Sequence, residues 1–536
     1  MIASGDDALR AANSARASLV HHLTTSYTGR LTIAFVVVSF SCAAIISVES
    51  NVPFLDGLYI AVSAVTCTGL VSISVLRLHT PSFVIMAFMM LFCNQMCITS
   101  VYPLIGRCWS FHVLLGKMQP SHKKERALKT YAAVKAALLV MVSYILTHVL
   151  LGIVLLTGAL QMQPNDATLS QRNISRESVA SFLSLSGFTQ GGFAMTANSV
   201  QYLKNNPLAY LLLSFIILAG SELAPVLVLV HIYFLRFLCV SCCGLDPRHL
   251  DHLLERGEDF SPFFFPLGKA LYLSAAALAI IAAQYVFFLI STVGRDDSLQ
   301  LYGSGFTLVG LGYFQCVATR FAGFQIINLR HISQGMLVVY AMAMYIVPAT
   351  ALSLGRRSAS KARTTHLGLH LRSDDIPPPP PPSISSGHNT QHPPHPAVDS
   401  SFLFLPAIYA KARRWGELQL HLDNNHGNWL MLCFFVLSFT EDAHCASQRA
   451  PCTYNLYYNL FEVVSAYTNA GVSVGLPGEA YSYSGNFSSA GKVVIIFLML
   501  LGKHRGFPPT NSICMDMSLA LFLQTEAALS GDSTSL

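Results

Sequence analysis

Ser63-Ala-Val-Thr-Cys-Thr-Gly69 is a run of small and hydroxyl-bearing residues that ends in glycine between two apolar regions. The chain contains three counterparts of it, Ser186-Gly-Phe-Thr-Gln-Gly-Gly192, Val317-Ala-Thr-Arg-Phe-Ala-Gly323 and Ser465-Ala-Tyr-Thr-Asn-Ala-Gly471. One such glycine alone would indicate a turn or a close helix contact. Four copies in one chain instead predict a pseudo-fourfold pore.

The composition indicates a membrane protein. Hydrophobic residues make up 53% of the 536 residues and charged residues only 11%, whereas an average soluble domain has about 25% charged residues. We therefore expect the lipid bilayer to be the main partner of this chain. The net charge of +6 fits basic loops beside membrane spans better than nucleic-acid binding. The sequence contains no nucleotide-binding P-loop and no HExxH spacing, so we expect neither an enzyme nor a cofactor beyond a transported ion.

Apolar runs of a length that suits a bilayer predict eight spanning helices. They lie at 31–48, 81–104, 134–160, 207–237, 266–293, 334–354, 428–439 and 490–501. Each pair encloses a shorter segment with one copy of the repeat, at 54–65, 178–188, 301–317 and 456–467. Non-helical backbone at membrane depth is tolerated where it lines a water-filled path. The predicted fold is an all-α membrane protein of four membrane-pore-membrane repeats, with four re-entrant half-helices around a pseudo-fourfold central pore.

Basic residues predict the orientation. They are concentrated at 107–129 and in a proline-rich linker at 356–424, so both segments should be cytoplasmic. The predicted order is a cytoplasmic N-terminus (1–30), repeats at 31–106, 131–238, 266–355 and 425–506 separated by these loops, and a cytoplasmic C-terminus (507–536). The first apolar run is too long for a signal peptide and has no clear cleavage site, so we expect it to be retained in the plasma membrane. The linker is either a spacer or a site for a proline-reading domain.

Two pairs of residues fall on the predicted outer face. Asn173 and Asn486 each begin an N-x-S sequon, which makes them candidate glycosylation sites. Cys445 and Cys452 lie in one predicted outer loop, and a disulfide between them is a hypothesis.

The repeats offer cation chemistry. Backbone carbonyls can replace the hydration shell of a cation when glycine allows unusual dihedral angles, as in the potassium-channel filter. Each copy here offers one glycine, whereas the potassium-channel filter has two, so we expect a shorter coordination zone. The C-terminal ends of the half-helices would face the membrane centre and favour a cation over an anion.

Several motifs resemble the Trk/Ktr/HKT superfamily of potassium and sodium transporters. They are Asp56-Gly-Leu-Tyr-Ile-Ala-Val-Ser-Ala64, Phe193-Ala-Met-Thr-Ala-Asn198, Arg320-Phe-Ala-Gly323-Phe, Met344-Tyr-Ile-Val-Pro348, Phe461-Glu-Val-Val-Ser-Ala466 and Gly502-Lys-His-Arg-Gly-Phe-Pro508. The last motif is more similar to fungal-type Trk proteins than to plant HKT proteins. The resemblance implies the four-repeat fold and a homodimer with one pore per subunit. Cytoplasmic nucleotide-binding partners serve some bacterial relatives, but nothing in this sequence indicates a soluble partner.

The resemblance also implies a selectivity filter. Its expected segments are Thr66-Cys67-Thr68-Gly69, Thr189-Gln190-Gly191-Gly192, Arg320-Phe321-Ala322-Gly323 and Thr468-Asn469-Ala470-Gly471, with K+ or Na+ at the four glycines. In HKT proteins a serine at the first glycine position accompanies sodium selectivity, so the presence of Gly69 favours potassium. Cys67, Gln190 and Gly191 depart from the common family pattern. We expect selectivity to lie in the different side chains around the ring.

Charged residues inside predicted spans are costly and therefore candidates for function. Glu222 either faces the cation path or pairs with a basic residue. Lys492 and Arg505 resemble family residues near the inner pore and are candidates for a gate, although Arg505 could equally reach the cytoplasmic interface. Arg320 is expected to brace carbonyls beside the filter.

The sequence as a whole predicts transport of monovalent cations, with K+ uptake foremost and Na+ as a second ion. A sodium-selective or K+/Na+-coupled transporter of the same fold is the alternative within transport. A non-conducting regulatory or scaffold subunit is the alternative from another class.

Overall fold

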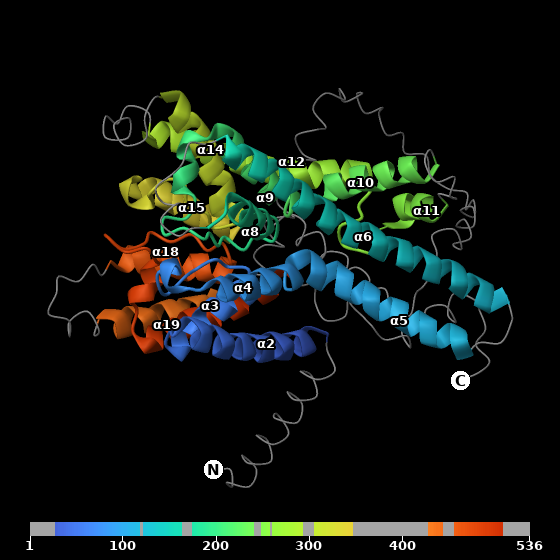
Figure 1. The fold of residues 1–536 in the computed structure, drawn as a ribbon, viewed down its shortest axis with the longest axis horizontal. Helices are drawn as coiled ribbons and strands as arrows, with labels where there is room; N and C mark the ends of the chain where they lie inside the picture. Colours follow the sequence, from blue (N-terminus) through green and yellow to red (C-terminus); the bar gives the residue numbers. More distant parts are fainter. Residues whose placement is uncertain are drawn as a thin grey trace, which may run out of the picture.

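The computed structural model describes residues 27–117, 122–162, 174–240, 248–257, 260–292, 305–346, 427–442 and 455–506, and these form a helical protein without strands in the described ranges (Figure 1). The predicted linker, both predicted termini apart from residues 27–30, Asn173, Cys445 and Cys452 lie outside the described residues.

The helices form four units, and each unit contains a long or medium helix, a short buried helix and a helix after the filter segment. Unit one comprises α2 (Tyr27–Ser50), α3 (Phe54–Thr66) and α4 (Thr80–Phe92), followed by α5 (Tyr102–Lys117). Unit two comprises α6 (His122–Gln161), α8 (Arg176–Phe188) and α9 (Pro207–Ala219), followed by α10 (Ala224–Leu238) and α11 (Arg248–Arg256). Unit three comprises α12 (Leu267–Thr292), α14 (Gly305–Phe321) and α15 (Gln334–Tyr345). Unit four comprises a helix over 427–442, α18 (Leu456–Thr468) and α19 (Ser489–Lys503).

The short helices α3, α8, α14 and α18 coincide closely with the predicted re-entrant segments, and we call them the pore helices. They pack in a closed order: α4 contacts α8, α9 contacts α14, α15 contacts α18, and α19 contacts α3. Each contact joins one unit to the next, and the last joins unit four to unit one. Figure 1 shows the pore helices grouped together, while α5, α6 and α10 extend from this group toward one end of the molecule.

Three described helices are long and apolar enough to cross a membrane on their own, in α2, α6 and α12. Two further pairs of helices are long and apolar enough only when taken together, as a broken span or a re-entrant loop, with a bend of 46° between α4 and the helical segment that leads into α5, and of 87° between α9 and α10. The predicted continuous helices at 81–104 and 207–237 are therefore both broken. Asn94 explains the first break, because its side chain accepts a hydrogen bond from the Cys97 amide at 2.8 Å and donates to the Leu91 carbonyl at 2.8 Å.

The outer surface is strongly apolar. Val48 on α2, Val154 and Leu139 on α6, Ile290 on α12 and Phe439 in the 427–442 helix are all at least 65% exposed. Exposed apolar patches of this extent indicate contact with lipid. The pore helices are instead buried, with Tyr59, Leu183, Phe314 and Phe461 almost wholly enclosed.

Candidate ion pathway

The four glycines of the filter segments form a closed ring. Gly69, Gly192, Gly323 and Gly471 have φ values of 97°, 69°, 65° and 74°, in the region that favours glycine. A Cβ added to any of them would lie under 3.0 Å from the backbone of the next segment. The contact runs from Gly69 to Gly191, from Gly192 to Ala322, from Gly323 to Ala470 and from Gly471 back to Thr68. The repeat predicted from the sequence is thus brought together around one axis, and no side chain fits between the segments.

A common backbone turn precedes the glycine in three of the four units. In units one, two and four, a residue two positions before the glycine adopts a left-handed conformation, with φ of 55° at Cys67, 63° at Gln190 and 54° at Asn469. The next amide then bonds back to the pore helix, as in Thr68 N to Ser63 O at 2.8 Å. These turns resemble Schellman caps, which end a helix and redirect the chain.

A vestibule of about 380 Å³ lies on one side of the ring, and we call it the loop-side vestibule. All four glycines and the loops that follow them line it. Hydrogen bonds between units hold these loops: Gln325 Nε2 donates to Ser473 O at 2.5 Å, and Arg330 Nη2 donates to Gly475 O at 2.5 Å. Val71 and Ser482 exchange hydrogen bonds at 3.0 Å between units one and four.

A second space of about 140 Å³ lies on the other side of the ring, and we call it the helix-side cavity. Residues at the C-terminal ends of the pore helices line it, together with both helix breaks and the end of α19. Its wall includes Thr66, Cys67, Gln95, Thr99, Thr189, Gln190, Gly220, Ser221, Glu222, Pro262, Phe263, Arg320, Phe321, Met344, Ile346, Thr468, Asn469, Gly502, Lys503 and Arg505. Helix C-termini carry partial negative charge, so their arrangement here favours a cation.

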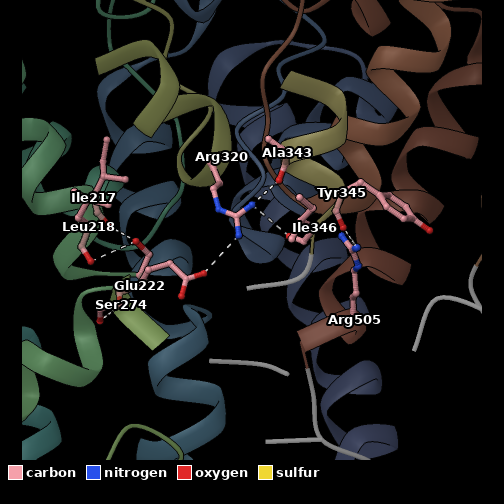
Figure 2. A network of polar contacts seen from close by, with 10 residues as sticks. Ile217, Leu218, Glu222, Ser274, Arg320, Ala343, Tyr345, Ile346 and Arg505 are labelled. Atoms are coloured by element: carbon pink, nitrogen blue, oxygen red, sulfur yellow. Dashed lines mark hydrogen bonds and ion pairs between the residues drawn. The ribbon is translucent and has the colours of Figure 1, made fainter. Parts of the chain in front are cut away.

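Glu222 and Arg320 form a buried ion pair at the wall of the helix-side cavity (Figure 2). Their closest charged atoms lie 3.7 Å apart, and both side chains are at most 2% exposed. Of the two readings left open for Glu222, the internal pair is thus present, and Glu222 also lines the cavity. Arg320 donates to the Ala343 carbonyl at 2.5 Å and the Ile346 carbonyl at 3.5 Å. The carbonyls that it contacts therefore belong to the end of α15, whereas we expected carbonyls beside the filter.

Two cations from unit four approach the same cavity. Lys503 is 6% exposed, and its Nζ donates to the carbonyl of Thr66, the first residue of the first filter segment, at 3.0 Å. Arg505 donates to the Tyr345 carbonyl and lies over the rings of Tyr345 and Tyr467, with its guanidinium 4.7 Å and 5.2 Å from the two ring centroids. Figure 2 shows Arg505 beside Tyr345, on the same side of Arg320 as Ala343 and Ile346. Lys503 was missed as a candidate because it ends an apolar run and looks in sequence like an interfacial lysine.

Lys492 lies elsewhere. It is near the start of α19, and its Nζ pairs with Asp56 Oδ1 near the start of α3 at 2.8 Å. It is not among the residues that line the helix-side cavity. The resemblance that grouped Lys492 with Arg505 thus joined a residue near the start of α19 with one in the short 3₁₀ turn (His504–Gly506) after its end. Asn486 is exposed in a short 3₁₀ turn before α19.

Several known proteins are similar to this chain in sequence. The potassium transporter TRK1 of Candida albicans is 27% identical over 410 residues, covering 76% of this chain and 35% of the relative. The low-affinity potassium transport protein of Saccharomyces cerevisiae is 26% identical, covering 69% of this chain and 41% of the relative. The sodium transporter HKT1 of Arabidopsis thaliana is 24% identical, covering 69% of this chain and 66% of the relative. The chain thus spans 35% to 41% of the length of these two fungal relatives.

Among solved structures, the potassium transporter TrkH from Vibrio parahaemolyticus matches with a TM-score of 0.48 and 13% identity, over 89% of this chain and 82% of that chain. The family model TrkH, described as cation transport protein, matches residues 30–516. The matched range covers most of the chain and contains all four filter segments. The chain therefore belongs to the TrkH family of cation transport proteins.

Proposed function

We propose that this chain transports monovalent cations across a membrane through the ring of Gly69, Gly192, Gly323 and Gly471, with K+ as its main ion and Na+ as a second. The observation that carries the proposal is the closed contact of the four glycines, in which each segment abuts the next. Carbonyls held at such a ring can replace the hydration shell of a cation, as in other cation filters. The names of the fungal relatives support K+, and the name of the plant relative supports Na+ as the runner-up.

The helix-side cavity supports a barrier below the filter. Lys503 holds its ammonium against the Thr66 carbonyl, and Arg505, also from unit four, donates to the Tyr345 carbonyl at the end of α15. A fixed positive charge repels a permeating cation, so an ion leaving the filter must pass these two groups. Glu222 offsets part of this charge through its pair with Arg320. In this proposal Lys503 and Arg505 limit flow, while Lys492 joins α19 to α3.

The proposed membrane topology and oligomeric state are those expected from the sequence. Eight helices cross the plasma membrane, both termini are cytoplasmic, the loop-side vestibule opens outside, and the protein is a homodimer with one pore per subunit. Asn486 is then an outer-face glycosylation site, which fits its exposure.

The experiment is cation uptake by a K+-uptake-deficient cell that produces this chain. We expect it to restore growth at low K+ and to take up Rb+, and we expect Gly192→Arg, at equal abundance in the membrane, to abolish both. Na+ uptake without K+ or Rb+ uptake would favour the sodium transporter instead. Movement of neither ion, in cells and in proteoliposomes of the purified chain, would favour the scaffold reading and overturn the proposal.

A further inference from the structure

In each of the four units, one side chain at the end of the pore helix contacts a backbone carbonyl on the helix after the filter. Gln190 Nε2 donates to Gly220 O at 3.3 Å in unit two, and Asn469 Nδ2 donates to Met499 O at 3.0 Å in unit four. Arg320 makes the corresponding contacts to the end of α15 in unit three. In unit one the Cys67 thiol lies 3.8 Å from the Met90 and Cys93 carbonyls.

The acceptors share a position. Met90 and Cys93 lie at the end of α4, Gly220 caps α9, Ala343 and Ile346 lie at the end of α15, and Met499 is in the last turns of α19. The last four carbonyls of a helix have no partner within it, so the acceptors at the ends of α4, α9 and α15 are available to a donor from outside, whereas Met499 lies one position before the last four of α19. The side chains that differ from one unit to the next therefore contact the helices after the filter, and they also line the helix-side cavity. They are Cys67, Gln190, Arg320 and Asn469.

The backbone beneath three of these contacts is held in a disfavoured state. Cys67, Gln190 and Asn469 have left-handed dihedral angles, which non-glycine residues adopt only when the surrounding structure holds them there. Close packing assists in units two and four. A Cβ on Gly220 would meet the Phe188 carbonyl, and a Cβ on Gly502 would meet the Tyr467 carbonyl. Phe188 and Tyr467 occupy the same place in units two and four, where each immediately precedes the filter segment.

Asn469 also joins two units. Its Nδ2 lies 2.8 Å from Thr68 Oγ1, one residue before Gly69 in the ring. Thr68 Oγ1 in turn lies 2.7 Å from Thr66 Oγ1. One amide thus connects the first filter segment, the fourth filter segment and α19.

We propose that Gln190 and Asn469 are positioning residues for ion selectivity, each acting as a clasp that ties the filter backbone to the end of the helix that follows it. The inference rests on the proposed cation transport. Loss of a clasp frees the filter backbone from the helix that follows it, and the carbonyls then adapt to ions of different size. Cys67 provides the weakest clasp, because a thiol is a poor donor and both of its contacts are long.

The test compares K+ and Na+ in one uptake assay, in which Na+ competes with Rb+ and the signal is normalised to folded protein in the membrane. Gln190→Met keeps the size of the side chain and removes the donor, and Gln161→Met makes the same change at an exposed residue at the end of α6. Asn469→Gly removes the amide and also relieves the left-handed strain, so strain cannot explain its effect. Cys67→Asn introduces in unit one the amide that unit four has, in a conformation that asparagine tolerates.

We expect Gln190→Met and Asn469→Gly each to lower the K+/Na+ preference by about fivefold, the scale of one hydrogen bond, while Gln161→Met leaves it unchanged. We expect Cys67→Asn to raise the preference. Wild-type selectivity in both clasp variants would overturn the inference while the proposed function stands. Failure of the unmodified chain to move either ion would instead overturn the proposed function, and this inference with it. If neither clasp variant folds, Cys67→Asn decides, because an unchanged or lower preference there contradicts the clasp.

Discussion

The third filter segment differs from the other three in how its pore helix ends. In units one, two and four the helix stops before a left-handed residue, whereas α14 continues through Phe321 and the bond to the pore helix comes from Gly323 N to Ala318 O at 2.9 Å. Relative to its glycine, the pore helix therefore runs one residue further than in units one and four, and two residues further than in unit two. The position three residues before the glycine holds Arg320 in unit three and Thr66, Thr189 and Thr468 in the others.

This comparison separates what the ring requires from what each unit supplies. All four units require a glycine with positive φ that abuts the next segment. The group that contacts the following helix varies. It is a thiol in unit one, an amide in unit two, a buried guanidinium in unit three and an amide in unit four. The arginine of unit three comes with an acid from unit two, Glu222, which makes this link the most dependent on a partner.

The largest effect should follow from removing the cation of unit three. Arg320→Gln leaves Glu222 buried without its cation, and we expect the free energy of unfolding to fall by about 3–5 kcal/mol. Thermal unfolding of the purified protein in detergent measures this loss. The double variant Arg320→Gln/Glu222→Gln should recover part of it.

Lys129→Gln provides the control for loss of a positive charge alone, because the side chains of Lys129 and Glu125, which form an ion pair, are 75% and 61% exposed. Exposed ion pairs contribute little to stability, so we expect no measurable change in the free energy of unfolding of Lys129→Gln. A double variant as unstable as Arg320→Gln would show that Glu222 and Arg320 are not a coupled pair.

A glycine of the ring tests what the units share. Gly471→Ala introduces a Cβ that meets the Thr68 carbonyl, whereas Gly478→Ala introduces one into open space at a similar φ, 77° against 74°. Both variants bear the cost of a left-handed alanine, about 1–2 kcal/mol. Only Gly471→Ala should also lower Rb+ uptake, by about tenfold or more, which corresponds to ~1.4 kcal/mol in the barrier. Equal uptake by the two variants would argue against the ring as the path.

The smallest effect should follow from the hydroxyl at the position equivalent to Arg320. Thr468 Oγ1 donates to the Val464 carbonyl of its own helix at 2.8 Å, as Thr66 and Thr189 do in units one and two. Thr468→Val keeps the shape and should cost about 0.5–1.5 kcal/mol. Chemical denaturation measures the fall in the free energy of unfolding for Thr468→Val and for Arg320→Gln. A fall in Thr468→Val as large as that in Arg320→Gln would remove the distinction between unit three and the others.

Much of this arrangement is predictable from local sequence. Gly69, Gly192, Gly323 and Gly471 are recognisable because each follows a short apolar helix and precedes a loop, and the structure brings all four together. The pore helices are predictable for the same reason. The helix breaks are harder to predict, since Asn94 and Glu222 sit in runs that are apolar enough to read as continuous spans.

Partners across units are not predictable from local patterns. The pair of Glu222 with Arg320 and the contact of Lys503 with Thr66 join residues far apart in sequence, and each depends on how the units close. Lys492 and Lys503 lie on one apolar helix, and the run alone does not say which end faces the cavity. The extra residue at the end of α14 follows from backbone geometry around Phe321 and has no marker in composition.

The central claim is that a cation binds at the ring of four glycines, and crystals of the protein grown in Rb+ test it most directly. An anomalous difference map should show a Rb+ peak on the axis between the carbonyls of the four filter segments, and the peak should be absent in Gly471→Ala and retained in Gly478→Ala. A map with no Rb+ at the ring of the unmodified protein, or with Rb+ bound only elsewhere, would contradict the account.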